Sequence, residues 1–269
     1  MDYNTKQTAD QTINDILANK KEPLLSVFFT AGFPKLNDTS LILENLEKSG
    51  VDWVEIGIPF SDPIADGPTI QHSSSIALEN GMNLKLLFDQ LKSNAHQRKI
   101  PVILMGYFNT VFQYGMEQFC KDCEDCGVSG AILPDLTPEL FHKRYAALFE
   151  KHQLIMPLII TPETTAERIH FIDRIATGFI YLVSASGTTG KTLGFEDSSF
   201  QLVINQYKKS LKNPIMVGFG ISNHQDYQKA TQHSRGAIVG SAFIRHISQF
   251  GIGLASIQTF VKNIKNPFS

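Results

Sequence analysis

The chain has 269 residues, of which 42% are hydrophobic and 19% charged, a composition typical of a soluble globular protein. Its 24 Lys and Arg residues nearly balance 26 Asp and Glu residues, and the net charge of −2 argues against a protein that binds nucleic acid or anionic lipid. The longest apolar stretch, around Ile100–Phe108, is far shorter than the ~18 residues of a membrane span. The polar N-terminus lacks the apolar region of a signal peptide, so we expect a cytoplasmic protein.

Eight short apolar or β-branched runs alternate with segments of helical periodicity. The expected strands are Leu24–Thr30, Val51–Ile58, Pro101–Tyr107, Gly130–Pro134, Met156–Thr161, Phe179–Ser184, Pro214–Gly218 and Gly236–Val239. Several are apolar nearly throughout, as are the strands of a parallel sheet that helices cover. Eight strand–helix units without a long linker predict one (β/α)8 TIM barrel domain over residues 1–269, with an additional N-terminal helix near Thr8–Lys20 that covers the barrel bottom. A doubly wound open sheet is the alternative, although such a sheet usually has fewer strands.

Local signals mark the ends of several helices. Thr164-x-x-Glu167 and Ser222-x-x-Gln225 have the spacing of capping boxes, in which a hydroxyl and a longer side chain satisfy free backbone N–H groups. Gly50 and Gly127 stand where a helix is expected to end in the left-handed region.

The three cysteines have the spacing C-x-x-C-x-x-C, at Cys120, Cys123 and Cys126. An iron–sulfur site would need a fourth Cys ligand, which the sequence lacks. Met116, Phe119, Cys120 and Cys123 recur at helical spacing, which predicts one buried helix face that includes two of the thiols. We therefore expect reduced structural cysteines and no metal site.

The second expected strand carries a carboxylate on the face that points into the barrel. Val54, Ile56 and Ile58 share one face and suit packing against helices, so Glu55 points the other way. The active site of such a barrel lies at the carboxyl ends of its strands. Because burial disfavours the ionised form, we expect the pKa of Glu55 to be raised toward neutrality, as proton transfer at pH 7 requires.

The segment that follows, Pro59–Pro68, is expected to form a stiff loop because it contains three prolines and a glycine. We call it the acidic loop. It places Asp66 above the barrel mouth, and two carboxyl groups in different environments can hold different pKa values and roles. In the structural alternative, Asp62 and Asp66 cap turns or the next helix, and Glu55 forms a buried ion pair.

Glycine-containing turns follow the last three expected strands, at Ser184–Gly190, Gly218–Ser222 and Gly240–Ala242. Glycine lets backbone N–H groups approach an anion, helix N-termini add donors, and late-strand loops are the usual phosphate site of these barrels. The turns contain few Lys or Arg residues, so we expect backbone donors and Ser241 to hold a phosphate; ordinary tight turns are the alternative. Gly218-x-Gly220 lacks the third glycine of a dinucleotide fingerprint, which disfavours NAD.

The stretch from Glu55 through Gly57–Gln71 (GIPFSDPIADGPTIQ) resembles the signature of the tryptophan synthase alpha chain family. Thr30–Gly32, Met105–Asn109 and Pro134–Asp135 resemble the same family in order, as do the three glycine turns. The resemblance covers about residues 4 to 262. It implies a (β/α)8 lyase that cleaves indole-3-glycerol phosphate to indole and glyceraldehyde 3-phosphate in tryptophan biosynthesis.

The resemblance also implies roles for individual residues. Glu55 matches the glutamate that takes a proton from the glycerol hydroxyl and protonates C3 of the indole, and Asp66 matches the aspartate that holds the indole N–H. The substrate-binding positions that it implies are Phe28, Tyr107, Ile160 and Phe219 around the indole, Tyr181 near the glycerol phosphate, Thr189 in a closing loop, and Gly190, Gly220, Gly240 and Ser241 around the phosphate. From strand position alone, the four residues around the indole could equally be ordinary core.

The family resemblance further implies an assembly of two alpha and two beta chains that passes indole internally. Asp62 and Pro63 lie in the loop expected to face the beta chain. No cofactor is expected in this chain, because pyridoxal phosphate belongs to the beta chain. Three alternatives remain open: a stand-alone lyase that releases indole freely, a non-catalytic regulatory subunit, and a sugar-phosphate isomerase or epimerase barrel. The last would explain the phosphate site but not the acidic loop.

Overall fold

The core of the molecule is an eight-stranded parallel sheet with the strand order β4-β3-β2-β1-β8-β7-β6-β5. The computed structural model describes residues 12–183, 207, 210–218 and 220–266. Its strands are β1 Leu24–Thr30, β2 Trp53–Gly57, β3 Val102–Met105, β4 Gly130–Ile132, β5 Leu158–Ile160, β6 Ile180–Val183, β7 Ile215–Gly218 and β8 Gly236–Val239. A bridge between Gly130 and Ile155, just before β5, joins the two ends of this order. The sheet therefore closes into the predicted barrel, and the open-sheet alternative is wrong.

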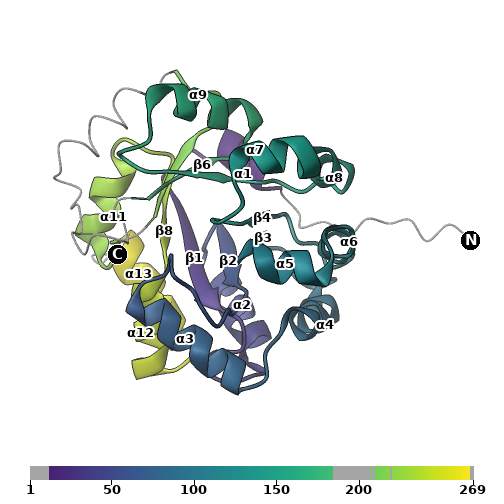
Figure 1. Cartoon of the computed structure of the whole chain (residues 1–269). Coiled ribbons are helices and arrows are strands. Elements are labelled where there is room, and N and C mark those ends of the chain that lie inside the picture. The colour runs from purple at the N-terminus through teal and green to yellow at the C-terminus, as the bar shows by residue number, and fades with distance from the viewer. Residues whose placement is uncertain (1–11, 184–206, 208–209, 219, 267–269) are drawn as a thin grey trace, which may run out of the picture.

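Helices surround the strands, as Figure 1 shows. They are α1 Ile13–Asn19, α2 Asp38–Lys48, α3 Pro68–Glu79, α4 Leu84–Asn94, α5 Phe108–Tyr114, α6 Met116–Asp125, α7 Pro138–Leu140, the π-helical turn η1 Phe141–Tyr145, α8 Ala146–Lys151, α9 Ala166–Ile175, α11 His224–Thr231, α12 Ser241–Phe250 and α13 Leu254–Lys265. The helices α3 and α12 pack against β1 and against each other, and α13 packs against α12, at the lower left of Figure 1. This side carries the site described below.

The strands β1 and β8 have the predicted ends, and the other six cover fewer described residues than predicted; the predicted end of β6, Ser184, lies outside the described residues. Proline explains part of the difference, because it has no N–H to donate to a ladder. Pro101 and Pro214 therefore stand immediately before β3 and β7 rather than inside them.

Apolar side chains form two layers, one inside the barrel and one between the strands and the helices. The inner layer includes Leu24, Trp53 and Phe179, near the amino ends of their strands, and Ile13 and Ile16 of α1 pack against it. The helix α1 therefore covers the barrel bottom, as predicted. It begins after its N-cap, Thr12, and the predicted start near Thr8 lies outside the described residues.

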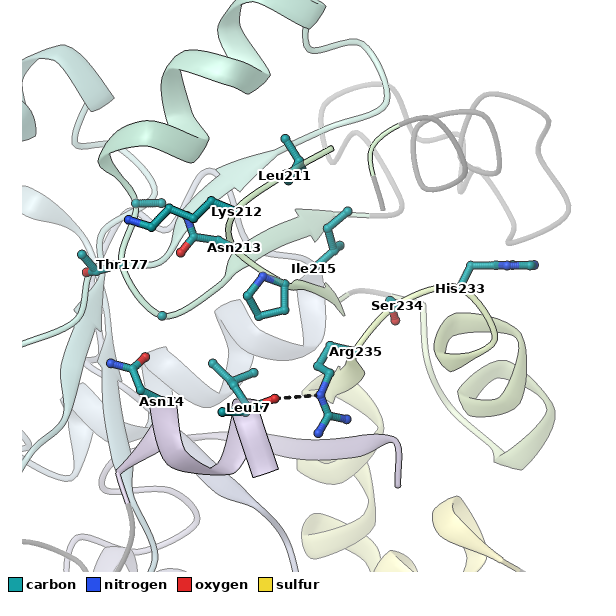
Figure 2. A pocket seen from close by; sticks show the side chains of 14 residues that line it. Asn14, Leu17, Thr177, Leu211, Lys212, Asn213, Ile215, His233, Ser234 and Arg235 are labelled. Carbon is teal, nitrogen blue, oxygen red and sulfur yellow. Dashed lines mark hydrogen bonds between the residues drawn. The ribbon is translucent and has the colours of Figure 1, made fainter. Parts of the chain in front are cut away.

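Arg235, just before β8, fastens α1 to the barrel. Its guanidinium donates from Nε to the carbonyl oxygen of Leu17 at 3.1 Å, from Nη1 to that of Glu22 at 2.9 Å, and from Nη2 to that of Lys20. Figure 2 shows the hydrogen bond from Arg235 to Leu17 beside a cavity of about 630 Å³ at the amino end of the barrel. On the same rim, the Asn213 amide donates to the Asp173 carbonyl oxygen at 2.8 Å. These polar side chains serve structural contacts at the end opposite to the expected active site.

Both predicted capping boxes are wrong by one residue. The N-cap of α9 is Thr165 rather than Thr164, and that of α11 is Asn223 rather than Ser222. In each case the cap side chain accepts the N–H three residues on, so the helix begins one position later than the box predicts.

The cysteine-containing segment forms α6, as predicted. Cys120, Cys123 and Cys126 are free and buried, and burial raises the pKa of the Cys120 thiol to about 12. Gly127, after this helix, has φ 63°, and Gly50, after α2, has φ 75°, so both adopt the predicted left-handed conformation. Within the described residues, no group of three His, Cys, Asp or Glu side chains is placed to hold a metal ion.

Candidate active site

Glu55 lies in the middle of β2 and points into the barrel, where its exposed fraction is 0%. Its ladder partner on β1 is Phe28. The Ser26 hydroxyl and the Trp53 indole N–H donate to Glu55 Oε1 at 3.3 Å and 3.4 Å, whereas Oε2 has no hydrogen-bond partner among the residues that the structure describes. The predicted inward orientation is confirmed.

Burial raises the pKa of Glu55 to about 8, and the hydrogen bonds from Trp53 and Ser26 offset only part of this effect. No cation among the described residues forms an ion pair with Glu55, so these residues do not supply the buried ion pair that the structural alternative requires. At neutral pH the carboxyl group is therefore mostly protonated and can act as an acid.

Asp66 is held by the acidic loop and by Tyr107, which follows β3. The Tyr107 hydroxyl donates to Asp66 Oδ2 at 3.2 Å and accepts the Ala65 N–H at 2.9 Å. Burial raises the pKa of Asp66 to about 6, and the hydrogen bond from Tyr107 opposes that rise. The ring of Phe60 stacks on the ring of Tyr107 with 4.8 Å between the ring centroids, and this packing fixes the orientation of the phenol.

The Asp66 carboxylate does not cap the following helix. The N-cap of α3 is Gly67, and among the described residues no side chain makes a capping hydrogen bond to the backbone there. Asp62 accepts the Ser61 hydroxyl at 2.5 Å on the exposed edge of the loop. The structural alternative therefore does not explain Asp66, whose carboxylate is free to receive a donor from the cavity.

A cavity of about 320 Å³ separates Asp66 from the first turn of α12. Its lining residues come from the carboxyl ends of the strands and the segments that follow them: Phe28, Asp66, Ile70, Met105, Tyr181, Gly220, Ile221, Ser222, Ile238, Gly240, Ser241, Ala242 and Arg245. Glu55 is not itself among them. Glu55 lies next to the cavity wall, because its partner in the β1–β2 ladder is Phe28, which lines the cavity. The lining residue Tyr181 is also close to both carboxyl groups: burial is the main cause of its raised pKa, and the charges of Glu55 and Asp66 raise it further.

The far end of the cavity has unused backbone donors. The Gly240 carbonyl oxygen accepts the N–H groups of Phe243 and Ile244, at 2.8 Å and 3.1 Å. The N–H groups of Ser241 and Ala242 donate to no group in the described residues. Because α12 begins here, these donors and the helix dipole favour an anion.

Six of the predicted site residues line one cavity: Phe28, Asp66, Tyr181, Gly220, Gly240 and Ser241. Tyr107 acts on it through Asp66. The structure does not bring Ile160 to the cavity, because Ile160 is paired with Leu182 in the helix-facing layer, whereas Ile159 is paired with Tyr181 in the inner one. Thr189, Gly190 and Phe219 lie outside the described residues.

Seven lining residues were not among the predicted site residues: Ile70, Met105, Ile221, Ser222, Ile238, Ala242 and Arg245. Met105 and Ile238 could have been found, since each alternates with residues on the inward faces of its strand. Arg245 follows Ser241 by four positions, which is about one helical turn, so a helix predicted from Ser241 onward would have pointed to it.

Comparison with known proteins gives one consistent result. The family model described as "Tryptophan synthase alpha chain" matches residues 15–266. The chain is 50% identical over 252 residues to the tryptophan synthase alpha chain of Flavobacterium psychrophilum, covering 94% of this chain and 98% of that one. It is 51% identical over 245 residues to that of Flavobacterium johnsoniae, covering 90% and 95%. The chain belongs to the tryptophan synthase alpha chain family.

The solved structures agree with this assignment. The crystal structure of tryptophan synthase subunit alpha from Legionella pneumophila superposes with a TM-score of 0.85 at 31% identity, covering 98% of each chain. The predicted barrel, the lyase class and the cleavage of indole-3-glycerol phosphate in tryptophan biosynthesis are thereby confirmed at the level of the family. Pyridoxal phosphate resides in the beta chain of the synthase. Every helix in the described residues is too short or too polar to cross a bilayer.

Proposed function

We propose that Glu55 and Asp66 carry out the cleavage of indole-3-glycerol phosphate, with the indole next to Asp66 and the phosphate at the first turn of α12. The observation that supports this most directly is the position of the two carboxyl groups, with Glu55 fully buried in the barrel and Asp66 on the wall of the adjacent cavity. Burial raises the pKa of Glu55 to about 8 and that of Asp66 to about 6. Near pH 7 one carboxyl group is an acid and the other an anion. This is the combination that the reaction requires.

The reaction can be written with every proton accounted for. Protonated Glu55 gives its proton to C3 of the indole, and the positive charge that develops on the ring is stabilised by a hydrogen bond from the ring N–H to the Asp66 carboxylate. The Glu55 carboxylate then takes the proton of the hydroxyl on the adjacent glycerol carbon. The bond between C3 and that carbon breaks, its electron pair returns to the ring, and indole and glyceraldehyde 3-phosphate form. Positioned acid–base catalysis of this kind contributes roughly 10²- to 10⁴-fold.

The phosphate end of the substrate fits the other end of the cavity. The free N–H groups of Ser241 and Ala242 and the Ser241 hydroxyl supply donors there. The positive φ of Gly220, 76°, turns the chain after β7 toward the same place, in a conformation that favours glycine. An ester phosphate held there leaves the apolar side chains of Phe28, Met105 and Ile238 for the ring.

The same proposal includes a beta chain as the partner, in an assembly of two alpha and two beta chains in the cytoplasm. Its support is the similarity to chains of Mycobacterium tuberculosis tryptophan synthase, at 26% identity and a TM-score of 0.84. Asp62 and Pro63 of the acidic loop would contact this partner, next to Ile64, whose exposed fraction is 82%. Indole release measured with and without a beta chain separates this proposal from a stand-alone lyase, since only the synthase subunit is strongly activated.

Glu55→Gln tests the chemical assignment. The variant keeps the shape of the side chain but has no proton to give, so we expect indole release to be lost while the circular dichroism spectrum and glycerol phosphate binding are kept. Glu79→Gln is the matched control, because Glu79 is exposed on α3 and lines no part of the cavity. Near-normal turnover by Glu55→Gln would remove Glu55 from the mechanism, and absence of indole release by the unaltered chain would favour a non-catalytic subunit.

A further inference from the structure

The phosphate end of the cavity contains a cation that sequence reasoning did not assign. Of the described residues that line the cavity, Arg245 is the only cation and Asp66 the only anion. Arg245 lies one helical turn after Ser241 on α12, so both side chains are on the same face of the helix. The guanidinium is therefore within reach of an anion held at the first turn.

Most of the hydrogen-bonding capacity of Arg245 is unused. A guanidinium has five N–H donors, and here one of them, on Nη1, donates to the Thr69 hydroxyl at 3.4 Å. This distance is at the weak limit for a hydrogen bond, and the Arg245 side chain is exposed. No other described group accepts from Arg245. Little has to be broken for the guanidinium to turn to a ligand.

With substrate bound, the cavity would contain two negatively charged groups, which a nearby cation would stabilise. A phosphate ester carries nearly two negative charges at neutral pH, and the proposed reaction adds the ionised carboxylate of Asp66 in the same cavity of about 320 Å³. The backbone donors at Ser241 and Ala242 are neutral. An arginine can form two parallel charge-assisted hydrogen bonds to phosphate, and its charge also reduces the repulsion between the phosphate and Asp66.

We propose that Arg245 binds the phosphate group of the substrate and supplies the positive charge of that subsite. This inference rests on the proposed function, in which the phosphate lies at the first turn of α12. Thr69 is the second residue of α3 and lies three residues after Asp66. The weak resting contact between Arg245 and Thr69 places the guanidinium beside the start of α3, and the phosphate replaces that contact on binding.

The test is the binding of sn-glycerol 3-phosphate, which has the phosphate arm but no indole, measured by titration calorimetry. A charge-assisted hydrogen bond contributes ~1.5–3 kcal/mol, so Arg245→Gln should bind this probe roughly tenfold or more weakly. The salt dependence of binding should also decrease, because a charged contact is lost. Arg245→Lys, which keeps the charge, should recover part of the affinity. In the indole-release assay, KM should rise more than kcat falls.

Two control variants separate charge at the cavity from other effects. Arg144→Gln removes an exposed arginine that lines no part of this cavity, and it should bind the probe as the unaltered chain does. Thr69→Val removes the resting contact but keeps the guanidinium, and it should also bind normally. Thermal unfolding of each variant checks that it is folded.

Equal affinity of Arg245→Gln and the unaltered chain overturns the inference, as does an equal loss in Thr69→Val, which would make Arg245 only a link between α12 and α3. Absence of probe binding by the unaltered chain overturns it as well. The proposed function fails differently. In that case the probe binds and depends on Arg245, but no indole is released.

Discussion

Replacement of Glu55 by Gln should make the protein more stable at high pH. The pKa of Glu55 is about 8 in the folded chain and near 4.5 when unfolded, so the folded state binds the extra proton. Stability is then lost as pH rises from the unfolded value to about 8, because the unfolded chain ionises first. Integrated over this range, the penalty is about 1 kcal/mol at pH 5 and about 4 kcal/mol at pH 8. The uncharged glutamine does not carry this penalty.

Urea unfolding of the two proteins at pH 5, 6, 7 and 8 measures the effect. Other titrating groups are common to both proteins, so they cancel in the difference between the two free energies of unfolding. That difference should change by about 3 kcal/mol in favour of Glu55→Gln between pH 5 and pH 8. A difference that does not vary with pH would refute the argument that Glu55 is protonated by burial in the folded chain.

Three further variants test the surroundings of the site. Tyr107→Phe removes the donor that lowers the pKa of Asp66, so the acidic limb of the kcat/KM profile, near pH 6, should move to higher pH; an unmoved limb contradicts this. Ser241→Ala should raise KM with little change in kcat, and a large fall in kcat at unchanged KM would contradict a binding role. Gly130→Ala places a methyl carbon 2.2 Å from the Ile155 carbonyl oxygen, where β4 meets β5. It should lower the free energy of unfolding by about 3 kcal/mol or more, and an unchanged urea midpoint would refute this.

The period of the strands was the most informative signal in the sequence. Two-residue alternation placed Glu55 inside the barrel, because Val54 and Ile56 needed the helix-facing layer. The same reasoning cannot orient Leu158–Ile160, because those three residues are all apolar and alternation gives no contrast there. The orientation of Ile160 was therefore decided by pairing with β6, which the sequence does not display.

Short local motifs were less reliable than the strand pattern. Thr164 and Thr165 are adjacent and both carry a hydroxyl, so the capping box could not tell which one ends the turn. The composition of the glycine turns suggested a phosphate site without a cation, because Arg245 is not part of those turns and lies one helical turn further along the chain, in α12. The side chain reaches the cavity only through the direction in which α12 leaves β8.

Because β1 pairs with the last strand, β8, the barrel cannot be completed until nearly the whole chain has been synthesised. β1 lies between β2 and β8, and Arg235 reaches back across 218 positions to the carbonyl of Leu17. At 5–20 residues per second, a ribosome needs roughly 10 to 40 seconds to travel from β1 to the end of β8. Throughout that interval one edge of the first strand is unpaired on the nascent chain. A growing polypeptide of this architecture is thus exposed to unwanted strand pairing for most of its translation.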